Sequence, residues 1–127
     1  MAVTIEEMSS TTTGTKTVAS LARDRALTTP GKIAMREKDF GIWQEYNWAQ
    51  TWDLIETAAH GLLAAGLEVG DRVAIHSEDN PEWIILDLAT VAVRGITVGL
   101  YPTNPSAAVA DLLGDCTPKL YFAEAQE

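Results

Sequence analysis

The order of apolar and polar residues predicts alternating strands and helices in the second half of the chain. Residues 72–77 and 96–100 are short runs rich in β-branched and apolar residues, which favour strands. Residues 81–94 between them are apolar around most of a helical circumference, so we expect a helix that is buried on two sides. A strand, a helix and a strand in this order predict a βαβ unit with parallel strands and a right-handed crossover.

A second unit follows directly. Residues 105–113 predict another crossover helix, with Val109, Leu112 and Leu113 facing inward, and residues 120–123 predict a third strand. The strands start near positions 72, 96 and 119, which is the even spacing of two successive βαβ units. The expected fold class is therefore α/β, with a three-stranded parallel βαβαβ sheet and flanking helices.

The first half of the chain predicts two helices and a hairpin. Residues 17–27 and 47–66 are helical in pattern, and residues 33–37 and 42–46 are short strands joined by a turn. The inward faces of the two helices are expected to carry Val18, Leu21, Ala22 and Ala26, and Trp52, Ile55, Ala59 and Leu62. Residues 1–16 are expected to be a flexible leader, and residues 17–127 one domain.

Polar side chains and glycines predict the helix boundaries. The expected N-caps are Thr17, Asn47, Asn80 and Asn104. Asn47 has Gln50 three residues later, as in a capping box. The expected ends are at Gly66, Gly95 and Gly114, because glycine adopts the left-handed conformation that ends many helices. In the polar stripe of the helix of residues 81–94, we expect Asp87, Thr90 and Arg94.

Charge and composition exclude several classes of partner. The 18 acidic and 9 basic residues give a net charge of -9, which repels nucleic acid and anionic lipid. No apolar run approaches the ~20 residues of a membrane helix, and acidic residues near the start argue against a signal peptide. Because Cys116 is the single cysteine, an internal disulfide is excluded and a reducing, cytoplasmic location is expected.

Titratable side chains offer few candidates for chemistry. Cys116 would need a histidine partner to act as a nucleophile, and neither His60 nor His76 has a suitable spacing, so we expect a packed or surface thiol. Glu56 and His60 lie one helical turn apart and could bind a metal or form an ion pair. Two ligands are too few for a metal site, which favours the ion pair.

The segment after the first parallel strand is the expected location of a ligand in an open α/β sheet. Glu78, Asp79 and Glu82 lie there and would either bind a cation or favour the positive end of the next helix; we favour the second interpretation. Trp83 either forms part of a contact face or lies flat over its own helix.

Nucleotide-binding loops of the common types are absent from the sequence. Gly61, Gly66 and Gly70 precede a strand, whereas a dinucleotide-binding loop follows one, and there is no Walker-type loop. A receiver-type signalling domain is also rejected, because the strand that ends at residues 100–103 supplies no acceptor aspartate. Residues 101–104 alone are interpreted as a connector.

The motifs in their order resemble a known family. The segments TVASLARDRALTTPGKIAMREKDFGIWQEYNW, YNWAQTWDLIETAAHGLLAAGLEVGDRVAIHSEDN and PEWIILDLATVAVRGITVGLYPTNP follow one another from residue 17. Together with the helix and strand that follow, they resemble the N-terminal part of the AMP-forming adenylating enzymes, nearest to the long-chain fatty acid–CoA ligases. The sequence departs from the family pattern at Asn47, where Thr or Ser is commoner, and at residues 117–118, where small residues are commoner.

The resemblance implies an enzyme of which this chain is one portion, cut short at its C-terminus. Such an enzyme activates a fatty acid with ATP and Mg²⁺ to an acyl-adenylate and then transfers the acyl group to coenzyme A. The family's phosphate loop, its aromatic-Thr-Glu segment, its ribose-binding aspartate and its C-terminal lysine have no counterpart in this sequence. We therefore expect no catalytic, cofactor-binding or metal-binding residue here, no cofactor bound by this portion alone, and no activity without the remainder of the enzyme as its partner.

The resemblance also implies a cytoplasmic enzyme or one peripheral to a membrane, without an integral membrane segment. The alternative is a stand-alone α/β interaction module that reuses this piece of the fold and docks through Trp83 and its neighbours.

Overall fold

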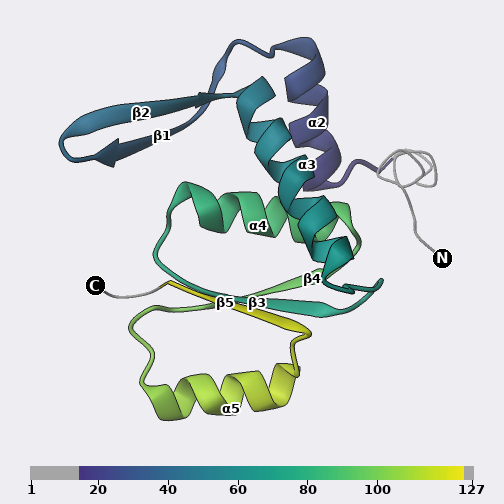
Figure 1. The fold of residues 1–127 in the computed structure, drawn as a ribbon, viewed down its shortest axis with the longest axis vertical. Helices are drawn as coiled ribbons and strands as arrows, with labels where there is room; N and C mark the ends of the chain where they lie inside the picture. Colours follow the sequence, from purple (N-terminus) through teal and green to yellow (C-terminus); the bar gives the residue numbers. More distant parts are fainter. Residues whose placement is uncertain (1–14, 125–127) are drawn as a thin grey trace.

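A small parallel sheet lies between helices in the computed structural model, which describes residues 15–124 (Figure 1). Its strands are β3 (Arg72–His76), β4 (Ile96–Leu100) and β5 (Leu120–Ala123), and its crossover helices are α4 (Pro81–Ala92) and α5 (Ser106–Cys116). The strand order is β4-β3-β5, and both neighbours of β3 are parallel to it. The predicted three-stranded parallel sheet is thus confirmed.

The two crossovers run in opposite directions across the sheet. The first leads from β3 to β4, and the second leads from β4 past β3 to β5. Figure 1 shows α4 on one face of the sheet and α5 on the other. A reversal of direction combined with a change of face gives both crossovers the same hand, as the handedness rule for parallel strands requires.

The central strand β3 is buried on both faces. Val73 and Ile75 face the layer of α3 (Trp48–Ala64) and α4, where they pack in the main core. Ala74 faces the opposite side and packs with Leu100 and Val109 beneath α5. This alternation explains why the strand reads as a continuous apolar run in the sequence.

The remaining elements pack outside α4. These are helix α2 (Val18–Thr28) and the antiparallel strands β1 (Ile33–Asp39) and β2 (Ile42–Asn47). Helix α2 lies against α3 and α4, whereas the hairpin projects away from the body of the molecule (Figure 1). The predicted hairpin and both predicted helices are confirmed.

Helix α2 turns a different face inward from the one that its sequence suggests. Ala19 and Ala22 are buried, while Val18 and Leu21 are 56% and 49% exposed. The prediction was correct for Ala22 and wrong for Val18 and Leu21. Alanines at the contact allow α2 to approach α3 closely, which longer side chains would prevent.

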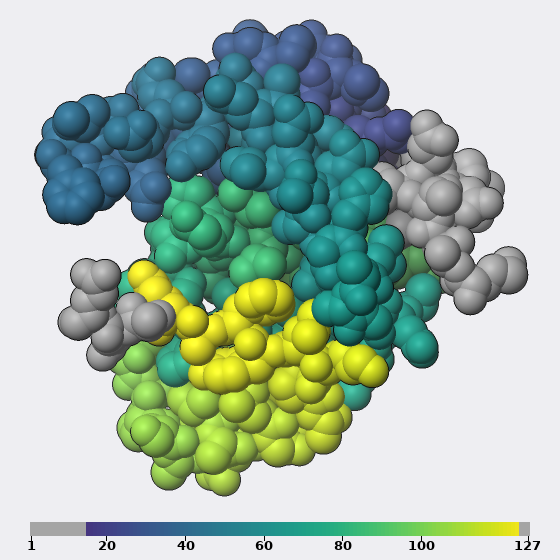
Figure 2. Space-filling view, viewed as in Figure 1, coloured from purple at the N-terminus to yellow at the C-terminus, as the bar shows by residue number. Residues whose placement is uncertain are grey.

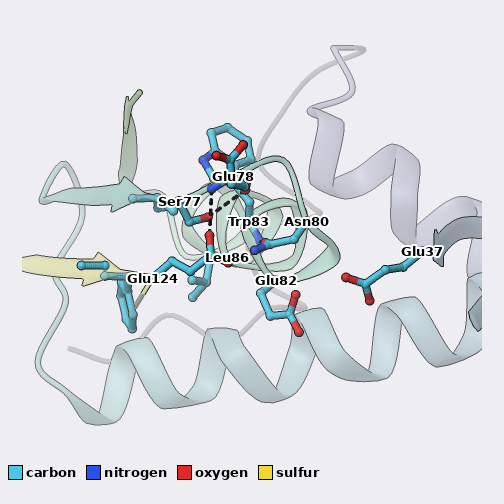
Figure 3. A pocket seen from close by; sticks show the side chains of 11 residues that line it. Glu37, Ser77, Glu78, Asn80, Glu82, Trp83, Leu86 and Glu124 are labelled. Atoms are coloured by element: carbon cyan, nitrogen blue, oxygen red, sulfur yellow. Dashed lines mark hydrogen bonds between the residues drawn. The ribbon is translucent and has the colours of Figure 1, made fainter. Parts of the chain in front are cut away.

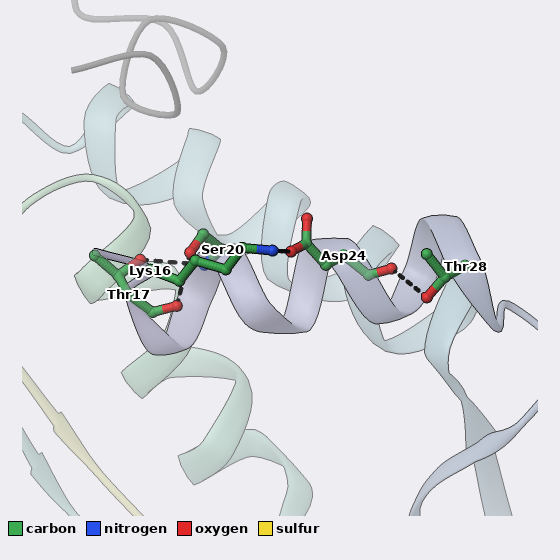
Figure 4. Close-up of polar contacts among 5 residues, drawn as sticks. All are labelled: Lys16, Thr17, Ser20, Asp24 and Thr28. Carbon is green, nitrogen blue, oxygen red and sulfur yellow. Dashed lines mark hydrogen bonds and ion pairs between the residues drawn. The ribbon is translucent and has the colours of Figure 1, made fainter. Parts of the chain in front are cut away.

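The start of α2 is fixed by local polar contacts (Figure 4). The Thr17 hydroxyl accepts a hydrogen bond from the Ser20 backbone N–H at 3.1 Å, which confirms the predicted N-cap. Lys16, which precedes the cap, forms an ion pair with Asp24 of α2. The expected leader otherwise lies outside the described residues, as do the last three residues, 125–127.

Two of the three predicted asparagine caps are present. Asn47 forms a complete capping box with Gln50, and the Asn80 side chain accepts from the Trp83 backbone N–H at 2.9 Å. The prediction for Asn104 was wrong, because α5 begins at Ser106 with Pro105 in the cap position and no side-chain cap bond.

Two of the predicted helix ends were also wrong. Gly66 has φ +86° after α3, as expected, and the following Leu67 is buried against the last turn. After α4, however, the left-handed residue is Arg94, with φ +63°, and not Gly95. Helix α5 continues through Gly114 to Cys116 and ends at the left-handed Thr117.

Gly95 has a different role from the one predicted. A Cβ atom at this position would lie 2.9 Å from Thr90 Cγ2, so a side chain here would force its neighbours to move. Thr90 itself was placed in the polar stripe of α4 and is instead fully buried. Its hydroxyl donates to the Leu86 carbonyl at 2.7 Å, so it is buried with its hydrogen bond satisfied.

Candidate functional site

A cleft of about 620 Å³ opens at the carboxyl ends of β3 and β5 (Figure 3). Figure 2 shows this side of the molecule, where the hairpin stands apart from the yellow strand β5. The apolar lining residues are Ile75, Trp83, Leu86, Phe122 and Ala123, and the polar ones are Glu37, Ser77, Glu78, Asn80, Glu82 and Glu124. The carboxyl edge of the strands is where open α/β sheets bind ligands, so this cleft is the candidate site.

Hydrogen bonds hold the loop between β3 and α4 against the end of β5. The Asn80 backbone N–H and the Ser77 hydroxyl both donate to the Glu78 carbonyl, each at 2.9 Å. The Glu78 backbone N–H donates to the Glu124 carboxylate, also at 2.9 Å. The position of the Glu124 carboxylate is therefore set by the backbone of a loop that lies more than forty residues earlier in the sequence.

Of the acidic residues predicted after the first parallel strand, the structure brings only some to the cleft. Glu78 and Glu82 line the cleft, but Asp79 does not. Within residues 15–124, no three histidine, cysteine or acidic side chains form a group that could hold a metal ion. Glu82 lies in the first turn of α4, which agrees with the interpretation that it favours the positive end of that helix.

Trp83 lies across the sheet rather than flat on its own helix. A Cβ atom at Gly99 of β4 would lie 3.2 Å from Trp83 Cζ2, so the ring tip rests above the glycine. The side chain is half-buried against the main core and also lines the cleft. The flat-lying alternative is therefore wrong, whereas a contact role at the cleft agrees with this position.

Sequence reasoning missed a histidine–tyrosine pair on the face covered by α5. His76 Nδ1 lies 2.8 Å from the Tyr121 hydroxyl, and the two rings are stacked with centroids 6.2 Å apart. His76 Nε2 is buried and has no hydrogen-bond partner among the described residues. The pair depends on the register of β3 and β5, which no local pattern in the sequence indicates, and neither side chain lines the cleft.

The other candidates remain apart. The Cys116 carbonyl accepts a hydrogen bond from Arg72 at the start of β3, whereas His76 lies at the opposite end of that strand, so they cannot form a nucleophilic pair. The ion pairs among residues 15–124 do not include Glu56 and His60, so that expectation was wrong. His60 is exposed and Glu56 partly exposed, and side chains in contact with water gain little from pairing.

No helix within the described range combines the length and the apolar character needed to cross a bilayer.

Comparison with known proteins identifies the larger context. The family model described as "AMP-binding enzyme" matches residues 22–127. The long-chain-fatty-acid–CoA ligase FadD15 of Mycobacterium bovis is 34% identical over 107 residues, which cover 84% of this chain and 18% of that protein. The chain therefore spans about a fifth of the length of this relative.

Solved structures give the same result for the fold. A putative long-chain-fatty-acid CoA ligase from Rhodopseudomonas palustris superposes with a TM-score of 0.77 at 28% identity, covering 87% of this chain and 27% of the other. The N-terminal subdomain of Klebsiella oxytoca NpsA has a TM-score of 0.79 at 18% identity, covering 89% of this chain and 29% of its own. The second likeness concerns the fold alone.

Proposed function

Because this chain belongs to the AMP-binding enzyme family, we propose that it is the opening portion of an ATP-dependent, AMP-forming ligase that joins fatty acids to coenzyme A. The observation that carries the proposal is the 34% identity with a long-chain-fatty-acid–CoA ligase over 107 residues of this chain. In such an enzyme, the fatty acid carboxylate attacks ATP and releases pyrophosphate. The thiol of coenzyme A then displaces AMP from the acyl-adenylate.

The cleft residues do not fit ATP or magnesium by themselves. The cleft is lined by four glutamates and no basic side chain, so a triphosphate would be repelled from it. The described residues also lack a group of three potential metal ligands. We therefore assign the binding of ATP, Mg²⁺ and coenzyme A to the remainder of the longer enzyme, and we expect the 127-residue chain alone to be inactive.

The test compares two proteins. One is the product of a longer reading frame that contains this sequence, and the other is the 127-residue chain. Each is incubated with ATP, Mg²⁺, coenzyme A and a series of saturated fatty acids, and both pyrophosphate release and acyl-CoA formation are measured. We expect both products from the longer protein and neither from the short chain. If the longer protein releases no pyrophosphate with any fatty acid, the proposal is wrong.

A stand-alone interaction module is the alternative function. The observation that favours it is the exposed apolar tip of the hairpin, where Phe40, Ile42 and Trp43 are 98%, 65% and 61% exposed. The length of the native reading frame and the folding of the 127-residue chain separate the two functions. A reading frame without a continuation, together with cooperative folding of the 127-residue chain, would favour the module.

A further inference from the structure

One strip of the parallel sheet, at the carboxyl end of β5, is only partly covered on the α4 side, whereas Leu120 earlier in β5 packs against the main core. Helix α4 packs against β3 and β4. Phe122 of β5 pairs with Ile75 in the register and so points to the same side of the sheet as α4, yet it remains 36% exposed beside the cleft. Parallel sheets are ordinarily covered on both faces, so this strip requires a covering segment.

The handedness of the crossovers restricts what can cover the strip. Helix α5 connects β4 to β5 in the direction that leads outward past β5, and it lies on the face opposite α4 (Figure 1). Another right-handed crossover outward from β5 would place its helix on the α5 face as well. The strip on the α4 side therefore needs a segment other than that next crossover helix.

The charge of the cleft specifies the chemistry of this segment. Glu37, Glu78, Glu82 and Glu124 line the cleft without a basic residue among its lining, and none of them belongs to an ion pair within residues 15–124. Figure 3 shows these four side chains around the cleft, and they come from four places: the hairpin, the loop after β3, the first turn of α4 and the end of β5. A second copy of the chain, with a net charge of -9, would be repelled.

We propose that this strip and the acidic cleft beside it dock a basic, partly apolar segment from the remainder of the longer polypeptide. Its apolar side chains cover Phe122, and its arginine or lysine side chains pair with the cleft carboxylates. Trp83, half-buried in the cleft wall, offers an aromatic surface to a guanidinium group. The inference rests on the proposed function, since the relative at 34% identity has more than four-fifths of its length outside the matched region.

The first experiment uses peptides as probes of the 127-residue chain. The probe is acetyl-Leu-Arg-Leu-Arg-amide, and the control peptide carries citrulline, a neutral isostere, in place of both arginines. Binding is followed by the indole N–H resonance of Trp83 in ¹H–¹⁵N NMR spectra, with the assignment made from Trp83→Phe. We expect a saturable shift with the arginine peptide and a dissociation constant at least about fivefold weaker with the citrulline peptide. Equal binding of both peptides, or binding of neither, would overturn the proposal.

The second experiment uses variants of the cleft. The double variant Glu78→Gln, Glu82→Gln is expected to weaken binding of the arginine peptide by about fivefold to tenfold, because two favourable charge pairs are lost. The matched control is Glu68→Gln, Asp111→Asn, which removes the same charge at exposed positions that do not line the cleft and should leave the affinity unchanged. Equal weakening in both double variants would show a general charge effect and would contradict a specific site.

The outcomes also separate this inference from the proposed function. If the longer protein forms acyl-CoA but the arginine peptide does not bind the 127-residue chain, the docking surface is wrong and the ligase function stands. If the peptide binds at the cleft but the longer protein forms no acyl-CoA, the ligase function is wrong and the basic-segment site stands as a property of this chain.

Discussion

Gly95 and Gly61 have opposite surroundings, which makes them a test at the scale of single residues. A Cβ atom on Gly95 would lie 2.9 Å from Thr90 Cγ2 and 3.2 Å from the Thr90 carbonyl oxygen, while one on Gly61 would meet nothing within 4 Å. We expect Gly95→Ala to lower the free energy of unfolding by about 1–3 kcal/mol, because the buried neighbours must move. Gly61→Ala should raise it by up to about 1 kcal/mol, because alanine favours the helix.

Urea denaturation of both variants measures these two effects. A stable Gly95→Ala protein would show that the contact with Thr90 relaxes without cost. A decrease in stability for Gly61→Ala would show that α3 is more closely packed at this position than the structure indicates.

Asn80 and Asn104 form a second residue-scale pair, since each precedes a proline at the start of a helix. Only Asn80 accepts a backbone hydrogen bond as a cap, whereas α5 has no side-chain cap bond. Asn80→Ala is therefore expected to lower the free energy of unfolding by about 0.5–2 kcal/mol. Asn104→Ala should change the free energy of unfolding by less than about 0.5 kcal/mol, as surface substitutions usually do.

The midpoints of thermal unfolding for these two variants provide the measurement. An equal decrease in the unfolding midpoint for both variants would indicate that Asn104 caps α5 in solution, contrary to the structure.

The residue pairs also show what the sequence predicted and what it did not. Identical Asn-Pro signals at residues 80–81 and 104–105 led to one correct cap and one wrong cap, because α4 begins at the proline itself, whereas α5 begins one residue after it and leaves the proline in the cap position. Gly95 was correctly singled out but for the wrong reason, since its small size matters and its φ does not. Residue type identifies candidates, while tertiary contacts determine which of them act.

At the scale of elements, α3 offers a comparison between its two faces. Ile55 is fully buried in the main core, and the adjacent Leu54 is 40% exposed. Ile55→Ala should lower the free energy of unfolding by about 2–5 kcal/mol, which is the range for replacing a large buried side chain with a small one. Leu54→Ala should cost much less, because much of its surface already contacts water.

Chemical denaturation monitored by circular dichroism measures both variants under the same conditions. Similar losses for Ile55→Ala and Leu54→Ala would mean that α3 is rotated relative to the packing described for it.

The elements were largely predictable, whereas the cleft was predicted only in part: the segment after β3 with Glu78 and Glu82 was singled out, but the residues that meet it from other elements were not. The spacing of apolar residues and the local composition predicted each helix and strand from residue 17 onward. Both signals depend only on neighbouring positions in the sequence. The cleft combines Glu37, Glu78 and Glu124, which come from the hairpin, the loop after β3 and the end of β5. The strand order β4-β3-β5 brings Glu78 and Glu124 together, and the packing of the separate hairpin adds Glu37; both are properties of the whole fold.

At the scale of the whole molecule, the excess of negative charge has a consequence for stability. The chain carries 18 acidic and 9 basic residues, and four carboxylates line one cleft. The ion pairs of the described residues, Lys16–Asp24 and Arg36–Glu45, are both solvent-exposed and contribute little. Self-repulsion of the folded state should therefore outweigh attraction between charges.

We therefore expect sodium chloride to stabilise the 127-residue chain. Raising the salt from about 0.01 to about 0.1 M shortens the screening length from about 30 to about 10 Å, which weakens repulsion between separated carboxylates. The melting temperature should rise by a few degrees, corresponding to about 1 kcal/mol or less for a domain of this size. The variant Glu37→Gln removes a cleft carboxylate that does not lie at a helix N-terminus, so it should melt higher at low salt and respond less to added salt. A melting temperature that falls with salt would show that attractive ion pairs, and not the acidic excess, dominate the electrostatics of the fold.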